Sequence, residues 1–348
     1  MKRLVDRLRK EHKLAPEEYR ALLTMRDQQD VEYLMHQARE VAQNQFGTGI
    51  YLRGLIELSN VCRNDCLYCG IRRSNSQVPR YTLTRDQVMD SCEQGYRIGF
   101  RTFVLQGGEW GEERSQWIAD IIHNIREKWQ DCAITLSLGE HQHETYALWR
   151  QAGADRYLLR HETHNERLYS LLHPRGMTIQ HRLQCLDWLK ELGYQVGAGI
   201  MVGSPFQSLS SVVEDIQYLV EFKPHMIGIG PFIPQHDTPF ARFPAGSADM
   251  TARLYAILRL ALPQTLIPST TAMATIAPDG RLRGILAGAN VVMPNLSPTD
   301  NRENYALYDN KASFGAESAQ GIQQLSDQLT TIGYHIDWSR GDSPTLGK

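Results

Sequence analysis

Three of the six cysteines in this chain lie in one short segment, where they could hold a metal centre. They are Cys62, Cys66 and Cys69, in the stretch Asn60-Val-Cys-Arg-Asn-Asp-Cys-Leu-Tyr-Cys-Gly70. Thiolates are ligands of zinc and of iron–sulfur clusters, and three of them are one short of a closed tetrahedral zinc site. An iron–sulfur cube bound by three cysteines leaves one iron without a protein ligand. The spacing therefore predicts a metal centre with one position open to another molecule.

A disulfide and a zinc site are the alternatives for these cysteines, and the rest of the sequence disfavours both. The N-terminus is charged every few residues and lacks the apolar region of a signal peptide, and no run approaches 18 apolar residues. We therefore expect a cytoplasmic protein, in which thiols stay reduced. No histidine lies between Phe46 and Ile122 to complete a zinc site. The net charge of −2 gives no sign of nucleic acid or a membrane surface as a partner.

The elements that must position the cysteines alternate along the chain. Residues 1–48 are predicted to form a helical extension that ends near Gly47 and Gly49. Strands are predicted near 51–58, 102–106, 133–138, 156–160, 196–202, 226–231, 266–270 and 289–293. Helices are predicted near 84–98, 114–130, 143–152, 178–192, 208–222, 249–262 and 281–287, with a last one at 315–332.

Eight strands alternating with helices favour an α/β fold, a parallel (β/α)8 barrel of the TIM type over residues 49–298. Residues 299–348 are expected to be a C-terminal helical segment that packs on the barrel, and an open doubly wound sheet is the alternative. Most predicted strands end in an unusual polar, Gly or Pro group. These groups are the cysteine segment, 107–109, 139–140, 160–163, 203–205, 231–234, 270–271 and 294–295. In a barrel they meet at the C-terminal mouth, where barrel enzymes carry their active sites.

The cysteine spacing resembles a known family signature. Cys62-x3-Cys66-x-Tyr68-Cys69 is similar to the motif of the radical S-adenosylmethionine (radical SAM) superfamily, and Gly107-Gly108-Glu109 resembles that family's motif for the methionine amino group. The resemblance implies one 4Fe–4S cluster on the three cysteines, with SAM chelating the fourth iron. It also implies that reduction splits SAM and releases a 5′-deoxyadenosyl radical, which suits a closed barrel that excludes water.

An ordered set of stretches narrows the resemblance to the iron–iron hydrogenase maturases of the HydE family, in the biotin synthase-like branch. The stretches are ELSNVCRNDCLYCGIRR, LSLGE, DRYLLRHET, GAGIMVG, GIGPFIP, IPSTTAMATI and GANVVMPN. This family implies action on a cysteine-bound iron carbonyl cyanide precursor, a small organometallic or amino-acid-derived substrate. It implies other hydrogenase maturation proteins and a reductant such as ferredoxin or flavodoxin as partners. The tail 307–320 lacks the cysteine trio that some members carry, so no second cluster is expected there.

The same resemblance assigns the residues that would contact SAM. Glu162 and Arg182 are implied to do so directly, Gln106 and Ser137 to support them, and Tyr68 to lie beside the cluster. From the residues alone, Glu162 could instead form an ion pair with Arg160. Arg182 lies in a helical pattern, in which an arginine is more often solvated.

A second polar group, deeper in the barrel, is predicted to bind substrate. A fixed guanidinium with hydroxyls suits an anionic ligand, although hydroxyls at a strand end are more often part of a turn. Two methionines could face the same cavity or fill the core. Two tyrosines resemble those that close the cavity in this family, and packing under the last helix is their alternative. These residues are Arg160, Ser269, Thr270, Thr271, Met201, Met273, Tyr305 and Tyr308.

Other functions remain open on the sequence. Biotin synthase needs a further cluster inside the barrel, but Cys92, Cys132 and Cys185 do not follow strand ends and are expected to be buried thiols. A methylornithine synthase is a rival within the superfamily. Outside it, an electron carrier would use four cysteines per cube, and a zinc-stabilised barrel would need a fourth ligand.

Overall fold

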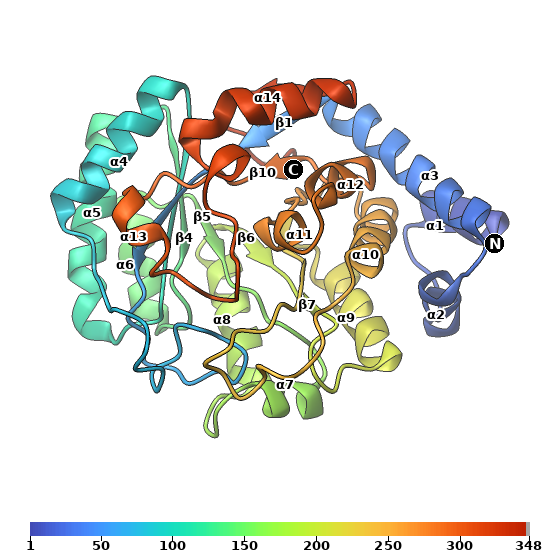
Figure 1. Ribbon diagram of the computed structural model, residues 1–348, viewed down its shortest axis with the longest axis horizontal. Coiled ribbons are helices and arrows are strands. Elements are labelled where there is room, and N and C mark those ends of the chain that lie inside the picture. Colours follow the sequence, from blue (N-terminus) through green and yellow to red (C-terminus); the bar gives the residue numbers. More distant parts are fainter. Residues whose placement is uncertain (346–348) are drawn as a thin grey trace.

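The computed structural model describes residues 1–345, and parallel strands form its centre (Figure 1). Six of them make one sheet, in the order β2 (Gly54–Ser59), β3 (Thr102–Gly107), β4 (Ala133–Ser137), β5 (Arg156–Leu158), β6 (Gln195–Ala198) and β8 (Met226–Ile227). Every neighbouring pair is parallel. Parallel strands need long crossovers, which the intervening helices provide. The last three residues of the expected C-terminal segment 299–348 lie outside the described residues.

Further pairings carry the strand ladder from β8 back to β2 and close the barrel. Leu266 bridges to Met226, and Pro268 bridges to Val291 in β10 (Val291–Val292). β10 pairs with β1 (Gly49–Leu52), and Asn295, just after β10, bridges to Leu55 of β2. The predicted (β/α)8 barrel is thus confirmed, and the open sheet is wrong. The strand predicted at 266–270 is reduced to these bridges, because Pro268 has no N–H to donate.

Two strands are interrupted where the barrel narrows. The strand after β6 resumes as β7 (Met201–Val202), and the one after β8 resumes as β9 (Gly230–Pro231). Between them, a Cβ atom added to Gly199 would lie 1.9 Å from the carbonyl oxygen of Gly228. Only glycine permits this close backbone approach. The approach keeps the two strands side by side as they continue toward the mouth.

The outer helices are α4 (Arg85–Ile98), α5 (Ser115–Lys128), α6 (His143–Ala152), α8 (Ile179–Glu191), α9 (Leu209–Phe222), α10 (Ala248–Ala261) and α12 (Gly280–Leu286). Local signals define their ends: Thr84 and Gln87 form a capping box at the start of α4. Gly99 and Gly153, both with positive φ, end α4 and α6 as the sequence predicts. Two shorter helices, α7 (Glu166–Leu172) and α11 (Thr271–Ile276), follow β5 and the bridge at Pro268.

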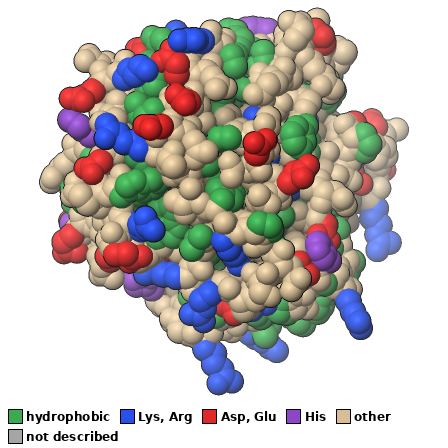
Figure 2. Space-filling view, turned by 60° about the vertical axis from the view of Figure 1, so that its left-hand side comes forward, with side chains coloured by type: hydrophobic (Ala, Val, Ile, Leu, Met, Phe, Trp, Pro, Cys, Tyr) green, Lys and Arg blue, Asp and Glu red, His purple; other side chains and the backbone are tan. Residues whose placement is uncertain are grey.

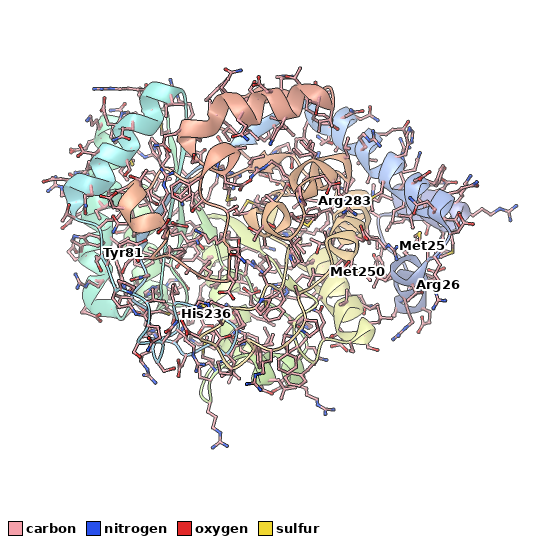
Figure 3. The ribbon with its side chains drawn as sticks, in the orientation of Figure 1. Met25, Arg26, Tyr81, His236, Met250 and Arg283 are labelled. Atoms are coloured by element: carbon pink, nitrogen blue, oxygen red, sulfur yellow. The ribbon has the colours of Figure 1, made fainter. Side chains whose placement is uncertain are left out.

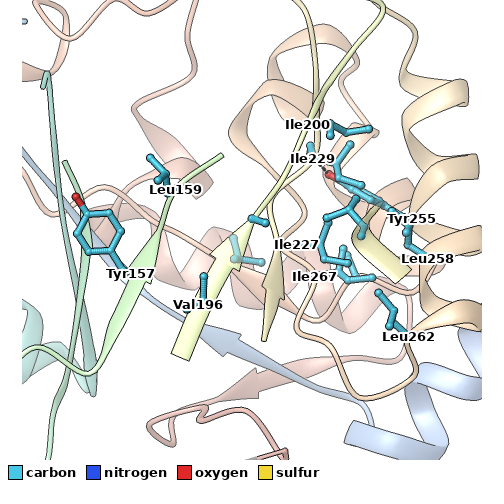
Figure 4. Packing of buried hydrophobic residues seen from close by; sticks show 14 of the residues in the cluster. Tyr157, Leu159, Val196, Ile200, Ile227, Ile229, Tyr255, Leu258, Leu262 and Ile267 are labelled. Carbon is cyan, nitrogen blue, oxygen red and sulfur yellow. Dashed lines mark hydrogen bonds between the residues drawn. The ribbon is translucent and has the colours of Figure 1, made fainter. Parts of the chain in front are cut away.

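The main core lies between the barrel strands and α10 (Figure 4). Ile227, Ile229 and Ile267 pack against Tyr255 and Leu258 of that helix, and all five are fully buried. The Tyr255 hydroxyl donates to the carbonyl of Ile229 at 2.8 Å, so the one polar atom of this ring is satisfied.

The N-terminal extension covers the other side of α10, whose residues 251–261 are all buried except the half-buried Arg253. The extension is three helices, α1 (Lys2–Glu11), α2 (Pro16–Thr24) and α3 (Gln28–Phe46), and both α1 and α3 pack on α10. The residues predicted as a helical extension are thus helical, in three separate helices. Pro16 starts α2 at its first position, and the Asp27 carboxylate caps α3.

The C-terminal segment differs most from expectation. The predicted helix 315–332 begins only at Ile322, as α14 (Ile322–Thr331), after two short 3-10 turns. A strand then follows, β11 (His335–Asp337), which pairs in parallel with β1. Beyond it, the chain crosses the N-terminal ends of the barrel strands, where Asp342 forms an ion pair with Arg156 at 2.6 Å.

Below the mouth, Arg53 is fully buried and only partly satisfied. Its Nη1 donates to the Met226 sulfur at 2.7 Å, but Nε and Nη2 have no partner in the described chain. Burial, and then the charge of Arg156, lower its pKa well below the ordinary value.

Exchange of the buried Arg53 for Met is therefore expected to raise the free energy of unfolding by about 1 to 4 kcal/mol, measured by urea denaturation. Arg97→Met, on the exposed side of α4, is the control and should change it by less than about 0.5 kcal/mol; a less stable Arg53→Met protein would contradict this account.

Candidate active site at the barrel mouth

The cysteine segment leaves the carboxyl end of β2 directly. Cys62, Cys66 and Cys69 are free, partly exposed thiols, and the backbone N–H of Glu109 donates to the Cys62 sulfur at 3.4 Å. Burial raises the pKa of all three thiols, and for Cys66 the neighbouring Cys69 and Cys62 raise it further. Metal ligation would reverse this, because a coordinating thiol loses its proton.

A single metal ion and a metal cluster differ in how closely their protein ligands must converge. No three Cys, His, Asp or Glu side chains in residues 1–345 converge closely enough to hold a single metal ion. A mononuclear zinc site needs its ligands around one point. A 4Fe–4S cube attaches each cysteine to a different iron atom, so its ligands stand farther apart. Three free thiols on one loop are the type of ligand that such a cube takes.

Arg80 holds the cysteine segment in shape, a role that no sequence motif indicated. Its two terminal nitrogens donate to four backbone carbonyls at 2.5 to 2.8 Å. Those carbonyls belong to Asn60, Ile71, Arg72 and Asn75, on both sides of the cysteines. One guanidinium thereby fixes the entry and exit of the loop. The sequence could not indicate this role of Arg80, because all four acceptors are main-chain atoms.

We expect Arg80→Met to reduce the iron retained after anaerobic reconstitution by at least about half, because four hydrogen bonds to a charged donor are lost. It should also speed release of iron to a chelator. Arg73→Met is the matched control, since the Arg73 guanidinium has no polar partner among residues 1–345. Equal iron retention in the two variants would show that the loop keeps its shape without Arg80.

The Gly-Gly-Glu motif joins the end of β3 to this loop. A Cβ atom on Gly108 would lie 2.1 Å from the Val61 carbonyl oxygen, so glycine is required for the contact. The Glu109 carboxylate is buried and already engaged: it accepts from Arg63 Nε at 2.9 Å and from the backbone N–H of Glu140 at 2.7 Å. Its side chain therefore braces the site, and the backbone of the motif faces the cysteines.

Arg182 lies inside the protein, contrary to the expectation for an arginine on a helix. It pairs with the Glu140 carboxylate and donates to the Arg160 carbonyl. His181 contacts the other oxygen of Glu140 at 2.8 Å. Burial alone would raise the pKa of Glu140, but the charge of Arg182 and its hydrogen bonds hold that pKa below its ordinary value. Glu140 was not singled out from the sequence as a site residue.

Glu162 and Arg160 form an ion pair at 2.8 Å, which was the alternative considered for Glu162. Glu162 also has φ of 63°, in the left-handed region that a non-glycine residue rarely adopts. Strain of this kind persists where the surroundings hold it, and it concentrates at functional sites. Arg160 Nε and Thr270 Oγ1 are buried without a hydrogen-bond partner in residues 1–345, so both can donate a hydrogen bond to a ligand.

The remaining sequence-predicted residues divide into two groups. Gln106 and Ser137 are register partners on β3 and β4, and Gln106 donates to the Tyr305 hydroxyl at 3.2 Å. Met201 packs in the apolar cluster that includes Tyr68. The others have structural positions: Ser269 donates to a backbone carbonyl, Thr271 begins α11, Met273 lies in the main core, and Tyr308 is half-buried.

Residues 303–314, which include Tyr305 and Tyr308, contact both the cysteine segment and the barrel strands. The Leu307 carbonyl accepts from the Gly70 N–H at 2.9 Å, next to Cys69. From the same segment Lys311 reaches inward and pairs with Glu57 of β2 at 2.6 Å, with both side chains buried. This segment thus connects the cysteine loop to the barrel interior.

Residues 56–219 match the radical SAM superfamily. The chain is 44% identical to the [FeFe] hydrogenase maturase subunit HydE of Thermotoga maritima over 289 aligned residues. The alignment covers 83% of this chain and 82% of that protein. The chain belongs to the HydE family of radical SAM enzymes. A 3-methylornithine synthase of Methanosarcina acetivorans is 29% identical over 85% of the chain and 83% of its own length. The solved structure of a methylornithine synthase has a TM-score of 0.85 at 26% identity, over 96% of this chain and 97% of that one.

Membership in the HydE family implies an enzyme that uses a 4Fe–4S cluster and SAM. The positions of the other three cysteines favour this assignment over biotin synthase, because none of them follows a strand end. All three are fully buried: Cys92 in α4, Cys132 before β4 and Cys185 in α8. No helix within residues 1–345 is both long and apolar enough to cross a bilayer.

Proposed function

We propose that Cys62, Cys66 and Cys69 hold a single 4Fe–4S cluster and that SAM binds to its open iron. The supporting observation is that three free thiols, an N–H donor to sulfur and a buried guanidinium all meet where β2 enters the mouth. When bound and reduced, the cluster supplies the electron that splits SAM into methionine and a 5′-deoxyadenosyl radical. Every other contribution comes from the residues around it.

For SAM, we propose that the backbone of Gly107, Gly108 and Glu109 receives the methionine amino group. The Glu162 carboxylate would accept the ribose hydroxyls and balance the sulfonium charge, since its pair with Arg160 uses only one oxygen. The buried Arg182 guanidinium suits the methionine carboxylate or ribose oxygens. Gln106, Ser137 and Tyr68 would complete this seat.

For the substrate, we propose a cysteine-bound iron carbonyl cyanide precursor of the H-cluster. Arg160 Nε and Thr270 Oγ1, both buried and unpartnered in the described chain, would donate to a cyanide nitrogen or carboxylate. Ser269, Thr271, Met201 and Met273 would line the same region less directly. Tyr305 and Tyr308 would close the cavity over the substrate and exclude water that would quench a radical.

The cofactor proposal is tested by anaerobic reconstitution. We expect about four irons per chain, a reduced cluster whose EPR spectrum changes when SAM is added, and 5′-deoxyadenosine in the presence of a reductant. An unchanged spectrum together with no 5′-deoxyadenosine would overturn it.

The substrate proposal is tested by in vitro maturation of an apo [FeFe] hydrogenase with the other maturation proteins supplied. Hydrogenase activity should depend on this protein and should be lost when it is omitted. Activity that is equally high without it would exclude the maturase role, even if SAM cleavage is intact.

A methylornithine synthase-type rearrangement of an amino acid is the second candidate. It is supported by the TM-score of 0.85 to a methylornithine synthase. Incubation with lysine, SAM and reductant distinguishes the two candidates, because only this one predicts 3-methylornithine as a product.

We also propose that the protein works in the cytoplasm, where a low-potential ferredoxin or flavodoxin can reduce the cluster. Contact with the other hydrogenase maturation proteins belongs to the same proposal.

A further inference from the structure

Exposed apolar side chains gather beside the cysteine segment. Val61, Leu171 and Phe206 are 41%, 38% and 57% exposed, and they are three of the seven large hydrophobic side chains that stand out from the surface of residues 1–345. Val61 directly precedes Cys62. Leu171 is the second-last residue of α7, and the last residue, Leu172, accepts a backbone hydrogen bond from Leu67 of the cysteine segment at 2.9 Å. Large apolar groups exposed together mark an interaction surface.

An aromatic path leads from this surface to the cysteine segment. The Phe206 ring lies 5.4 Å from that of Phe243 and 6.0 Å from that of Phe240. Phe240 belongs to the apolar cluster against which Leu67 and Tyr68 pack. Phe206 is also held at φ of 67°, a strained conformation for a bulky residue. The fold therefore maintains an exposed aromatic ring in continuous contact with residues between Cys66 and Cys69.

Basic side chains surround these apolar groups. Arg73, Arg167 and Arg175 are exposed, and their guanidiniums form no hydrogen bond or ion pair with the described chain. Arg167 is one helical turn from Leu171, and Arg175 follows His173, whose ring contacts that of Tyr68 at 5.6 Å. Glu166 is the exposed acid on α7. Figure 2 shows Lys and Arg side chains projecting from the lower edge of the molecule, where Figure 1 shows the cysteine segment and α7.

This basic edge is a local asymmetry, because the whole chain carries 37 basic and 39 acidic residues. We name Val61, Arg73, Arg167, Leu171, Arg175 and Phe206 the mouth patch. We propose that the mouth patch docks an acidic one-electron carrier protein of the flavodoxin or ferredoxin type. The inference rests on the proposed function, since it assigns a surface to the reductant of that same site.

The charge and position of the patch both favour this partner. An acidic carrier would be steered by the free arginines, and the exposed apolar groups would exclude water at the contact. All three cysteines are partly exposed at this face, so a docked carrier would stand beside the cluster. One electron then passes: the carrier is oxidised by one electron, the cluster is reduced by one, and SAM cleavage consumes it. No atom is transferred.

The test compares two triple variants. R73E/R167E/R175E reverses the charge of the mouth patch, and R3E/R26E/R97E reverses three exposed arginines, on α1, between α2 and α3, and on α4. With a reduced flavodoxin as probe, stopped-flow absorbance gives the rate constant for cluster reduction. At low ionic strength the patch variant should react about tenfold more slowly than the unchanged protein. The difference in rate should shrink at high ionic strength, where salt screens the charges. The control variant should react at the unchanged rate.

A second measurement does not depend on the cluster. Binding of oxidised flavodoxin to the cluster-free protein, followed by calorimetry, should weaken about tenfold in the patch variant and not in the control. Phe206→Ser should weaken it with little change in salt dependence. With excess dithionite, both triple variants should form as much 5′-deoxyadenosine as the unchanged protein.

The outcomes separate this inference from the proposed function. If the unchanged protein forms no 5′-deoxyadenosine with dithionite, the proposed function fails and the docking proposal fails with it. If dithionite works but both triple variants accept electrons from flavodoxin equally, only the docking proposal is overturned. Loss of binding to another maturation protein, with flavodoxin binding intact, would likewise overturn it and assign the patch to protein assembly.

Discussion

Exchange of Cys66 for serine is expected to abolish the metal centre and, with it, all SAM cleavage. A serine hydroxyl is a hard ligand that does not replace a thiolate on iron, and two remaining cysteines cannot bind a cube at three corners. Iron after anaerobic reconstitution should fall from about four per chain to well below one, and 5′-deoxyadenosine should fall below about 1% of the unchanged protein, because the cofactor carries the chemistry. Iron analysis and chromatography measure the two effects.

Cys185→Ser is the matched control for this experiment. Cys185 is fully buried in α8, and its thiol makes only a long contact with the His141 carbonyl oxygen, at 3.8 Å, so its exchange removes no strong hydrogen bond. Iron content and SAM cleavage should both stay within about twofold of the unchanged protein, since a small isosteric change leaves the mouth intact. If Cys66→Ser retained its iron, the metal would have to bind elsewhere, and the other three cysteines are too deeply buried to provide such a site.

The barrel was predictable because its signals are local and periodic. Apolar runs alternated with helical patterns, and the polar groups at strand ends gave the mouth. The contacts between Glu109, Cys62 and Glu140 confirm that residues far apart in sequence meet there. Where prediction was wrong, a single residue or a long-range pairing decided the outcome. Pro268 cannot donate to the ladder, and β11 is a strand only because β1 accepts it as an additional neighbour.

The site was predictable in its cysteines and less so in the residues that hold them. A thiol spacing is visible in sequence, whereas Arg80 acts on backbone carbonyls that any residue could supply. Arg182 is harder for another reason. Helical periodicity separates apolar from polar faces, so a polar residue that faces inward is assigned to solvent. Its partner Glu140 lies 42 positions away, and nothing local connects the two.

The buried ion pair between Arg182 and Glu140 gives rise to the second large expected effect, which is on stability. Arg182→Met should leave the Glu140 carboxylate buried without its guanidinium partner and reduce the free energy of unfolding by about 3 to 5 kcal/mol. The size of the effect should depend on pH. In the unchanged protein the lowered pKa of Glu140 stabilises the fold above the unfolded-state pKa, and this stabilisation is lost as the pH falls through the lower folded value. In the variant burial dominates and raises that pKa, so the variant loses stability as the pH rises. Denaturation should therefore show a larger difference at pH 7 than at pH 4.

The double variant Arg182→Met/Glu140→Gln separates the structural role of the pair from a role toward SAM. Removing the charge of Glu140 removes the unpaired buried carboxylate, so most of the lost stability should return and its pH dependence should disappear. SAM cleavage should not return if the Arg182 guanidinium contacts SAM. Recovery of both stability and cleavage would instead make Arg182 a structural partner of Glu140 alone. In that case the anionic groups of SAM would have to be bound by other donors at the mouth, of which Arg160 has an unpartnered Nε.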